Sequence, residues 1–296
     1  MLSVLIPVYN YDIIQLVYTI HKQLLASKIT FEILCFDDHS DNGISSSNSK
    51  IEQLENTSYH ISNNNLGRVA VRQTLAEKAN YDWLLFLDAD VIPKYDEFIS
   101  NYTALLFSDY DAIYGGFTYR NTPPKADHML RWTYGRSKEQ MPAIKRNQVP
   151  YKIVISGNFL IRTSLFIRLN SQITQKGYGY DNYFGALLKA HKSKVFHIDN
   201  EVFHLGLESN VIYLNKIEQS VDTLLILDRQ NAINKTENTL YNSYKHLKKL
   251  KLNYIFSFIH KKFNSNFRKN LLSSTPNILV LQCYKLSYIC YQDLNS

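Results

Sequence analysis

The sequence lacks several features that define particular protein classes. Only three cysteines occur in 296 residues, Cys35, Cys283 and Cys290, and their odd number and wide spacing argue against a disulfide framework or a zinc site. No stretch approaches roughly eighteen uninterrupted apolar residues, so we expect no transmembrane helix. The chain also begins directly in an apolar segment, without the basic region and cleavage site of a secretion signal. These absences predict a protein of the reducing cytoplasm.

Acidic residues are nearly missing from the C-terminal part of the chain. Between Asn238 and Ser296, nine lysines and arginines stand against a single acid, Asp293. This surplus exceeds the net charge of +7 of the whole chain, so the first 237 residues are almost neutral. Between Leu250 and Leu272, bulky apolar residues are interleaved with the lysines. The segment fits the headgroup region of an anionic membrane, and it equally fits a basic helix whose aromatic residues pack back on the preceding domain. We expect no nucleic-acid partner, because the rest of the chain has no nucleic-acid motif.

What the sequence does contain is an alternation of strand-like and helical segments. Helical patterns follow the first strand at Asp12–Ala26 and precede the central strand at Leu66–Ala79. Such alternation predicts a doubly wound α/β fold with a mostly parallel sheet. The region Thr122–Gln148 has no clear period, and we interpret it as a long functional loop, as short helices over a site, or as a surface insertion. The predicted strands are Leu2–Val8, Phe31–Phe36, Tyr59–Ser62, Trp83–Leu87, Asp111–Gly116, Ile153–Leu160 and Lys194–Ile198.

The strand Trp83–Leu87 ends in two carboxylates, Asp88 and Asp90. Open α/β sheets form their ligand crevice at the carboxyl ends of the strands, and alternation turns these two acids the same way. Two converging carboxylates repel each other unless a cation lies between them, and oxygen ligands suit Mg²⁺ or Mn²⁺. The alternative is a pair of acids that cap a turn before Pro93.

Four further acids and histidines are candidates, and two of them, Asp181 and His204, have a structural alternative. Asp37 and Asp38 follow the second strand, so they lie where ligands bind in such folds. Asp181 follows the segment Gly177-Tyr178-Gly179-Tyr180 and opens a helix, where it is either a helix cap or a catalytic acid. His204 follows an apolar pair, and a lone histidine there is a hydrogen-bonded structural residue unless a metal lies nearby.

Four motifs occur in an order that is typical of a known family. They are VLIPVYN at the start, FEILCFDDHSD at the second strand, NNNLGRVAVRQ followed by WLLFLDADVIP, and finally GYGYDNYFGALLKA. Through these motifs the chain from Leu2 to about Leu207 resembles the family 2 glycosyltransferases, which are nucleotide-sugar enzymes with the GT-A fold. The resemblance implies a catalytic domain over residues 1–209, with a donor half over about 1–116 and an acceptor half over about 117–209. A helical, basic extension would cover residues 210–296.

The resemblance also assigns roles in donor binding. Residues around the first two strand ends would pack against or hydrogen-bond the nucleotide base and ribose, and these are Pro7, Tyr9, Asn10, Asp37 and Asp38. Asn65 and Arg72 match the next donor-binding motif, although Gln73 stands where the family often has asparagine. The alternative for Arg72 is a solvated helix arginine.

The Asp-x-Asp motif and the later segment would supply the metal site and the base. By resemblance Asp88 contacts the ribose, while Asp90 binds Mg²⁺ or Mn²⁺ and His204 adds a further ligand, as in some relatives. The family base is often the acid of a Glu-Asp pair, but this chain has Asp181-Asn182. Asparagine accepts no proton near neutral pH, so either Asp181 is the general base or the site has lost it.

The sequence therefore predicts an inverting, metal-dependent glycosyltransferase. It would move a sugar from a nucleotide donor, a UDP-sugar by resemblance, to a glycan or lipid-linked acceptor of cell-envelope polysaccharide synthesis at the inner face of the cytoplasmic membrane. One alternative is a nucleotidyltransferase, but that enzyme needs a Gly-rich, basic loop after its first strand, and the PVYNYD segment is neither. Another alternative is a non-catalytic module that only binds nucleotide sugars.

Overall fold

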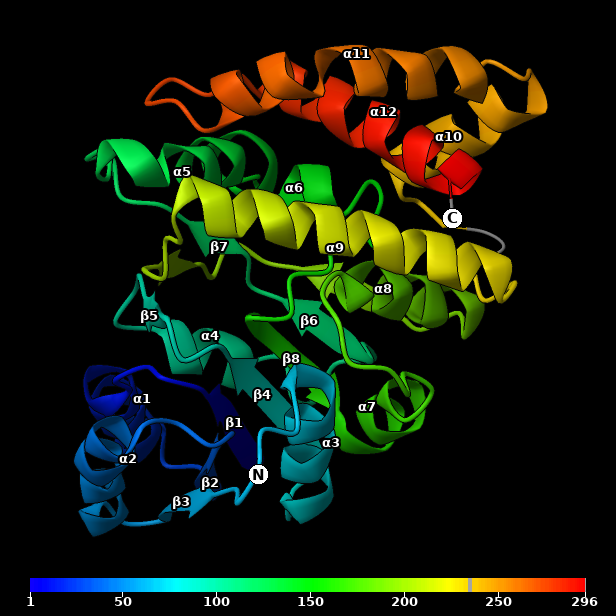
Figure 1. Ribbon diagram of the computed structural model, residues 1–296. Coiled ribbons are helices and arrows are strands. Elements are labelled where there is room, and N and C mark those ends of the chain that lie inside the picture. Colours follow the sequence, from blue (N-terminus) through cyan, green and yellow to red (C-terminus); the bar gives the residue numbers. More distant parts are fainter. Residues whose placement is uncertain (234–235, 296) are drawn as a thin grey trace. The chain divides into compact units, whose positions relative to one another are not determined.

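The computed structural model describes residues 1–233 and 236–295 (Figure 1). Residues 234, 235 and 296 of the expected C-terminal extension therefore lie outside the described residues. The chain forms two compact units that interleave along the sequence, and the expected boundary at residue 210 stays a prediction. The first unit comprises Met1–Thr118, Met141–Lys176 and His191–Gly206, and the second comprises Tyr119–Gln140, Gly177–Ala190 and Leu207–Ser296.

A seven-stranded sheet forms the centre of the first unit, in the order β3-β2-β1-β4-β8-β6-β9. Its strands are β1 (Leu2–Val8), β2 (Phe31–Asp37), β3 (Thr57–Ile61), β4 (Trp83–Leu87), β6 (Ala112–Tyr114), β8 (Asn158–Arg162) and β9 (Val195–His197). Strand β1 pairs in parallel with β2 and β4, whereas β8 is antiparallel to both of its neighbours. The predicted doubly wound, mostly parallel α/β fold is confirmed.

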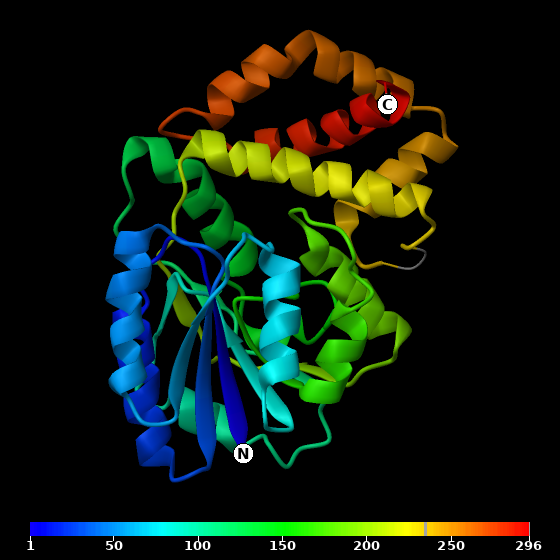
Figure 2. The ribbon, with the colours of Figure 1, turned by 60° about the horizontal axis from the view of Figure 1, so that its bottom comes forward.

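Helices cover both faces of this sheet. Figure 2 shows the strands between α1 and α2 on one side and α3 and α7 on the other. The central strand β4 is nearly continuous in large apolar residues, and all five of its side chains are buried, as expected of a strand that is covered on both faces. The helices of this unit are α1 (Ile14–Ser27), α2 (Asn42–Asn48), η1 (Ser49–Gln53), α3 (Arg68–Lys78), α4 (Phe98–Thr103), α6 (Ala143–Arg146) and α7 (Thr163–Asn170).

A second, three-stranded sheet in this unit was not predicted. It pairs β10 (Val202–His204) with β5 (Val91–Pro93) and β7 (Phe117–Thr118). Strands of two or three residues are too short to show an alternating pattern, so periodicity does not reveal them. The small sheet brings the segment after Asp90 beside His204.

Arg146 of α6 is a buried cation in the first unit, with only 1% of its surface exposed. Its Nη1 atom donates to the carbonyl of Tyr114 at 3.1 Å and to Nδ1 of His197 at 2.9 Å. The Nε2 atom of His197 lies 2.8 Å from the carbonyl oxygen of Pro150, which can only accept. This pattern fixes His197 as the neutral tautomer that carries its proton on Nε2.

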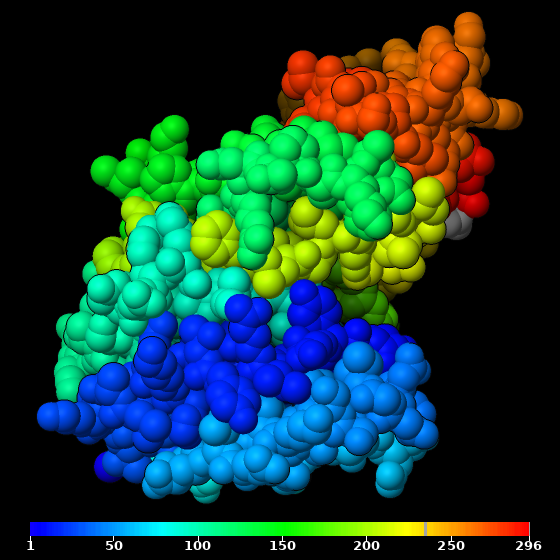
Figure 3. Space-filling model, turned by 90° about the vertical axis from the view of Figure 1, so that its left-hand side faces the viewer, coloured from blue at the N-terminus to red at the C-terminus, as the bar shows by residue number. Residues whose placement is uncertain are grey.

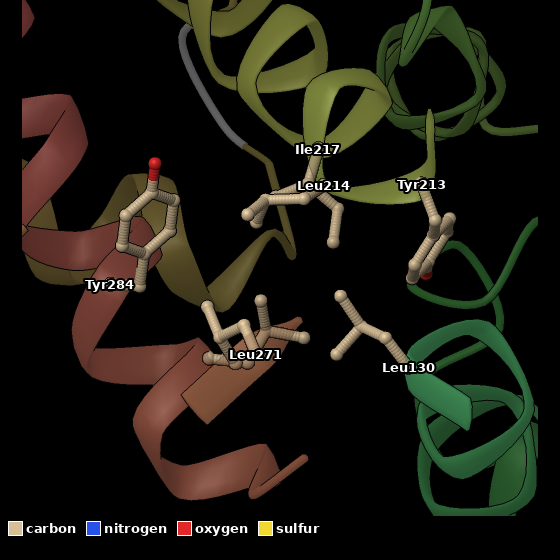
Figure 4. Packing of buried hydrophobic residues seen from close by; sticks show 7 residues of the cluster. Leu130, Tyr213, Leu214, Ile217, Leu271 and Tyr284 are labelled. Atoms are coloured by element: carbon tan, nitrogen blue, oxygen red, sulfur yellow. The ribbon is translucent and has the colours of Figure 1, made fainter. Parts of the chain in front are cut away.

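The second unit is helical, as the sequence predicts for the C-terminal part. Leu130, Leu214 and Leu271, from three different helices, point toward one another in its core (Figure 4). Helix α12 lies between α11 and α9 in both ribbon views (Figures 1 and 2). None of the helices in the described part of the chain has the length and hydropathy needed to span a membrane. The elements are η2 (Ala126–His128), α5 (Met129–Tyr134), η3 (Gly135–Glu139), α8 (Tyr180–Ala190), α9 (Asn210–Arg229), α10 (Thr239–Lys249), α11 (Asn253–Leu271) and α12 (Ile278–Asn295).

Candidate functional site

The site lies at the carboxyl ends of β2, β1 and β4, which are neighbouring parallel strands. Val8 at the end of β1 is in register with Asp37 at the end of β2, and β4 flanks β1 on its other side. Because parallel strands end at the same edge of a sheet, the loops that follow them meet there. The sheet thereby brings together the segments that follow Val8, Asp37 and Leu87, which are far apart in the sequence.

The loop after β1 is tied to the loop after β2. The backbone N–H of Asn10 donates to Oγ of Ser40 at 2.7 Å, and Oδ1 of Asn10 accepts from the N–H of Asp41 at 2.7 Å. Asn10 has a φ of 49°, a left-handed conformation that asparagine tolerates better than most residues. Between these fixed loops the side chain of Tyr9 is 57% exposed, and Pro7 is half-buried.

Asp37 is fully buried and satisfied by its own chain. Its Oδ1 atom accepts from the N–H of Ser40 at 2.7 Å, and its Oδ2 atom accepts from Oγ of Ser45 at 2.6 Å and from the hydroxyl of Tyr59. Burial alone would raise the pKa of Asp37, but these hydrogen bonds hold the pKa below its ordinary value. Asp37 is therefore ionised and stabilises the turn after β2. Its predicted contact with a donor stays a prediction.

Asp38 connects the end of β2 to the start of α3. Its two carboxylate oxygens accept from the N–H groups of Leu66 at 2.5 Å and Gly67 at 2.8 Å. Gly67 has a φ of 86°, which only glycine adopts without strain, and the side-chain amide of Asn65 donates to the carbonyl of Asp38 at 3.2 Å. The motif residues Asp38, Asn65 and Gly67 thus form one connected loop, and the donor contacts predicted for Asn65 and Asp38 are not tested by it.

Asp88 lies between two arginines of α3. Nη2 of Arg72 donates to Oδ1 of Asp88 at 2.5 Å, and Nη2 of Arg68 donates to Oδ2 at 2.7 Å. The same two guanidinium groups hold Ser156, through its carbonyl at 2.6 Å and its Oγ at 2.9 Å. The side chain of Arg72 is buried, whereas that of Arg68 is 45% exposed.

These arginines determine the charge of Asp88. Burial would raise the pKa of this carboxyl, but the positive charges of Arg68 and Arg72 hold its pKa below the ordinary value. Gly157 is required beside it, because a Cβ atom there would overlap Oδ2 of Asp88. The result is an ionised acid with one buried and one accessible cation.

Asp90 lies just before β5 and next to His204, which is on the neighbouring strand β10. His204 pairs with Val91 in the register of β10 and β5, and the N–H of Leu205 donates to the carbonyl of Asp90 at 2.8 Å. Nε2 of His204 lies 3.3 Å from Oδ2 of Asp90. Gly206 makes room for this carboxylate, because a side chain there would overlap it.

This pair fits a divalent cation as two of its ligands. Adjacent ligands of an octahedral ion, each about 2.1 Å from it, are about 3 Å apart, close to the observed separation. Mn²⁺ accepts carboxylate and imidazole ligands, and it leaves further positions to phosphate oxygens and water. Across residues 1–233 and 236–295 no group of three His, Cys, Asp or Glu side chains could hold a metal by itself. Asp90 and His204 would therefore hold a metal jointly with a bound ligand.

Asp181 belongs to the second unit, in the first turn of α8. Its side chain is exposed, and within the described chain it makes no hydrogen bond to a helix N–H of the kind a capping residue makes. Asn182 instead has a structural role, because its Oδ1 atom accepts from Nδ2 of Asn238 at 2.9 Å, just before α10. The role of Asp181 as the general base stays a prediction.

The structure thus brings most predicted donor residues to one edge of the sheet and adds residues that the sequence analysis missed. Arg68 could have been found, because it lies four positions before Arg72 and therefore on the same face of α3. Ser156 and Gly157 stand before β8 at the same site, but no local pattern connects them with Asp88. No local sequence pattern connects Gly206 with Asp90 either.

A doubly wound sheet with acids and arginines at the carboxyl ends of its strands places the protein in the class of open-sheet α/β proteins, which bind their ligands at that edge of the sheet. The family is defined by the sequence itself: residues 3–169, more than half of the chain, match the family described as Glycosyl transferase family 2. The chain belongs to this family. No curated protein matches it significantly.

Solved structures of similar fold include the following three proteins. A mannosyltransferase from Pyrobaculum calidifontis, in complex with GDP-Man and Mn²⁺, has a TM-score of 0.53 and 12% identity over 79% of this chain and 65% of its own. This chain thus spans just under two thirds of that protein. S. aureus TarS 1–349 has a TM-score of 0.51 and 15% identity over 99% of this chain and 91% of its own. Glucosyl-3-phosphoglycerate synthase from Mycobacterium tuberculosis, in complex with Mn²⁺, UDP and phosphoglyceric acid, has a TM-score of 0.50 and 11% identity over 79% of this chain and 80% of its own. At such identities the likeness concerns the fold, and it confirms the expected GT-A architecture.

Proposed function

We propose that this family 2 protein transfers a sugar from a UDP-sugar to a hydroxyl group of a glycan or lipid-linked acceptor in cell-envelope polysaccharide synthesis. The observation that carries the proposal is the ionised Asp88, held by Arg68 and Arg72, only two residues from the Asp90–His204 pair. A diphosphate needs cations, and a ribose needs a hydrogen-bond acceptor beside them. Structures of similar fold contain UDP-GlcNAc, GDP-Man or UDP, which supports a nucleotide-sugar donor.

In this proposal the base binds against the loop after β1. The exposed ring of Tyr9 offers a stacking surface, and the hydrogen bonds between Asn10 and the β2 loop keep this surface in place before the donor arrives. Pro7 borders the same loop. Asp37 is fully buried and holds the surrounding backbone through its hydrogen bonds, so it would act on the donor only by positioning this loop. Asp38 is the carboxylate proposed to accept from the base or ribose with a remaining lone pair.

Arg72 and Arg68 have different roles in the proposed donor site. Arg72 is buried and keeps Asp88 oriented toward the ribose hydroxyls. Arg68 is half-exposed, so its guanidinium can exchange Asp88 for an oxygen of the donor diphosphate. Asp88 then has one oxygen free to accept a ribose hydroxyl.

Asp90 and His204 would hold the metal together with the diphosphate. When bound, the ion would neutralise charge that grows on the leaving nucleoside diphosphate. We expect Mn²⁺ to serve better than Mg²⁺, because Mg²⁺ strongly prefers oxygen and one of these ligands is a nitrogen. Two of the structures of similar fold contain Mn²⁺, which supports this choice.

Asp181 is the proposed general base. Its carboxylate would take the proton of the acceptor hydroxyl while that oxygen attacks the anomeric carbon, and the nucleoside diphosphate would leave from the opposite face. A single displacement of this kind inverts the anomeric configuration. Asn182 cannot replace it, because an amide does not accept a proton near neutral pH.

A ligand panel tests the proposed function. We expect a UDP-sugar to raise the unfolding temperature of the protein by mass action, and Mn²⁺ to increase this shift. Release of UDP from the stabilising sugar, with and without added acceptors, then distinguishes an enzyme from a binding module. The proposal is wrong if UDP-sugars neither stabilise nor are turned over. Stabilisation by nucleoside triphosphates alone would favour a nucleotidyltransferase, which the loop Tyr9–Asp12, without glycine or basic residues, does not support.

A further inference from the structure

Helix α11 has one face fixed in the core of the second unit. His260 is 4% exposed, and its Nδ1 atom lies 3.2 Å from Oγ of Ser287 on α12. Near the other end, Nη1 of Arg268 donates to Oε1 of Glu218 on α9 at 2.6 Å, and Leu271 is fully buried. These contacts at separate turns determine the rotation of the helix about its axis. The opposite face is therefore turned outward as a defined surface.

This outward face carries large apolar side chains that no other part of the described chain covers. Tyr254 and Phe258 are each 62% exposed, and Ile255 is 56% exposed. Leu250, in the turn before the helix, adds a side chain that is 53% exposed. We call these four residues the α11 apolar patch. The orange residues that include this helix stand at an outer edge of the second unit in Figure 3.

Exposed lysines lie just before α11 and along it, without any acid among them. No Asp or Glu occurs between Leu250 and Leu272, and these exposed lysines form no ion pair with any described residue. They are therefore uncompensated charges on a surface that also exposes aromatic rings. These lysines are Lys249, Lys251, Lys261, Lys262 and Lys269.

We infer that the α11 apolar patch and its lysines form a docking surface for an anionic lipid bilayer. An amphipathic helix that lies in the interface buries aromatic and aliphatic side chains at the headgroup boundary while lysines contact lipid phosphates. Tyrosine suits this position, because its ring is apolar and its hydroxyl stays hydrated. The helix lies on the membrane and does not cross it.

Charge argues against a second copy of the chain as the occupant. A twofold interface on this face would bring the lysines of both copies into one apolar contact, and neither copy has an acid between Leu250 and Leu272 to pair with them. Uncompensated charges that are desolvated at an interface cost more than the patch would gain. A bilayer supplies the missing negative charge.

The inference extends the proposed function, because a lipid-linked acceptor would lie in the same bilayer to which the α11 apolar patch binds. Binding is measured on the full chain without any donor, so its failure leaves the transferase proposal standing, and failure of transfer leaves the lipid surface standing. We expect cosedimentation with vesicles of phosphatidylcholine and phosphatidylglycerol at low salt. High salt or pure phosphatidylcholine should strongly reduce it.

Matched variants separate the two parts of the surface. Lys261→Gln with Lys262→Gln should weaken binding to anionic vesicles by about 30-fold, since each lysine near such a surface contributes a factor of about five. Phe258→Ser should weaken it by about tenfold through lost apolar burial. Controls on the first unit are Lys22→Gln with Lys78→Gln, and Phe107→Ser, whose side chain is 97% exposed. These should bind like the parent.

A spectroscopic readout covers the case in which overall binding is too weak to sediment. Tyr254→Trp places a fluorophore in the patch, and its emission should shift to shorter wavelength with anionic vesicles, whereas Phe107→Trp should show no shift. Equal effects of patch and control variants, or binding that is indifferent to lipid charge, would overturn the inference. So would a concentration-dependent dimer that Phe258→Ser dissociates, because the second copy would then be the occupant.

Discussion

Arg72 and Asp88 are joined by a 2.5 Å hydrogen bond that links the first turns of α3 to the end of β4. Arg68 engages the other oxygen of the same carboxylate, but from a half-exposed position. The buried pair is therefore part of the fold, whereas the accessible one is available to a ligand. We therefore expect Arg72 to contribute mainly to the stability of the fold and Arg68 mainly to binding of the proposed donor.

Replacing each arginine by glutamine should separate these roles. Arg72→Gln removes donors from buried acceptors on Asp88 and Ser156, so we expect the free energy of unfolding to fall by about 3 kcal/mol. Arg68→Gln removes a largely solvent-screened pair, so the loss should stay below about 1 kcal/mol while donor affinity falls at least tenfold. Urea unfolding and donor titration measure the two effects. Equal destabilisation by both variants would contradict this division.

The metal pair predicts a shared dependence on Mn²⁺. Asp90→Asn and His204→Ala should each abolish the increase in nucleotide affinity that Mn²⁺ causes in the parent protein, as measured by calorimetry with UDP. Asp109→Asn, which changes an acid with a 95% exposed side chain, is the matched control. A parent protein that binds and turns over its donor equally well in EDTA would refute the metal site.

Gly206→Ala tests the same pair without changing a ligand. The added methyl group would overlap the Asp90 carboxylate, so the side chain must move away from His204. We expect the Mn²⁺ effect on UDP affinity to weaken by at least tenfold, with donor binding in EDTA unchanged. Gly43→Ala, where a Cβ atom meets nothing within 4 Å, should leave both affinities unchanged.

Asp181 predicts a loss of turnover without a loss of binding. Asp181→Asn should lower kcat by about 10²–10⁴-fold, the usual range for removal of a general base, while donor affinity and the unfolding temperature stay the same. The control is Asp127→Asn, an acid of the same unit with a 70% exposed side chain. A parallel fall in donor affinity, or markedly earlier unfolding, would instead support a helix-capping role for Asp181.

His197 predicts a loss of stability in mild acid. Its burial and the neighbouring Arg146 lower its pKa to about 4, against 6.5 for an ordinary histidine. Between these two pH values His197 binds a proton in the unfolded chain but not in the native state. The free energy of unfolding should therefore decrease as the pH falls below about 6.5 and become constant below about 4, with a total loss of about 3 kcal/mol. His197→Gln should flatten this part of the urea-derived stability curve. Asp37, whose pKa is lowered, adds a loss of the same sign at lower pH.

Much of the fold could be read from the sequence, because its long elements carry strong patterns. The predicted strand Leu2–Val8 matches β1, and Trp83–Leu87 matches β4, since continuous apolar runs with polar ends leave little choice of boundaries. For Thr122–Gln148, short helices are present, one of the expected outcomes. The strands β5, β7 and β10 were missed because two or three residues cannot display a period.

The site was only partly predictable for a related reason. Acids that directly follow an apolar run are visible in the sequence, so Asp88 and Asp90 could be placed just after a buried strand from the sequence alone. What surrounds them depends on contacts between distant segments, such as Ser156 with Arg68 and Gly206 with Asp90, and no local pattern encodes these. The sequence also cannot show that the Asp37 carboxylate is turned into the protein, because burial depends on the packing of Ser45 and Tyr59.

The pairing of Val91 with His204 also has a consequence for the order in which parts of the protein fold during synthesis. A nascent chain that has emerged only as far as the family match, residue 169, already contains β1, β2 and β4 with their acids. It still lacks the imidazole opposite Asp90, because β10 is synthesised later. The strand ends that carry the residues proposed to bind the nucleotide are therefore synthesised first, whereas the proposed metal pair forms only after a late, long-range strand pairing.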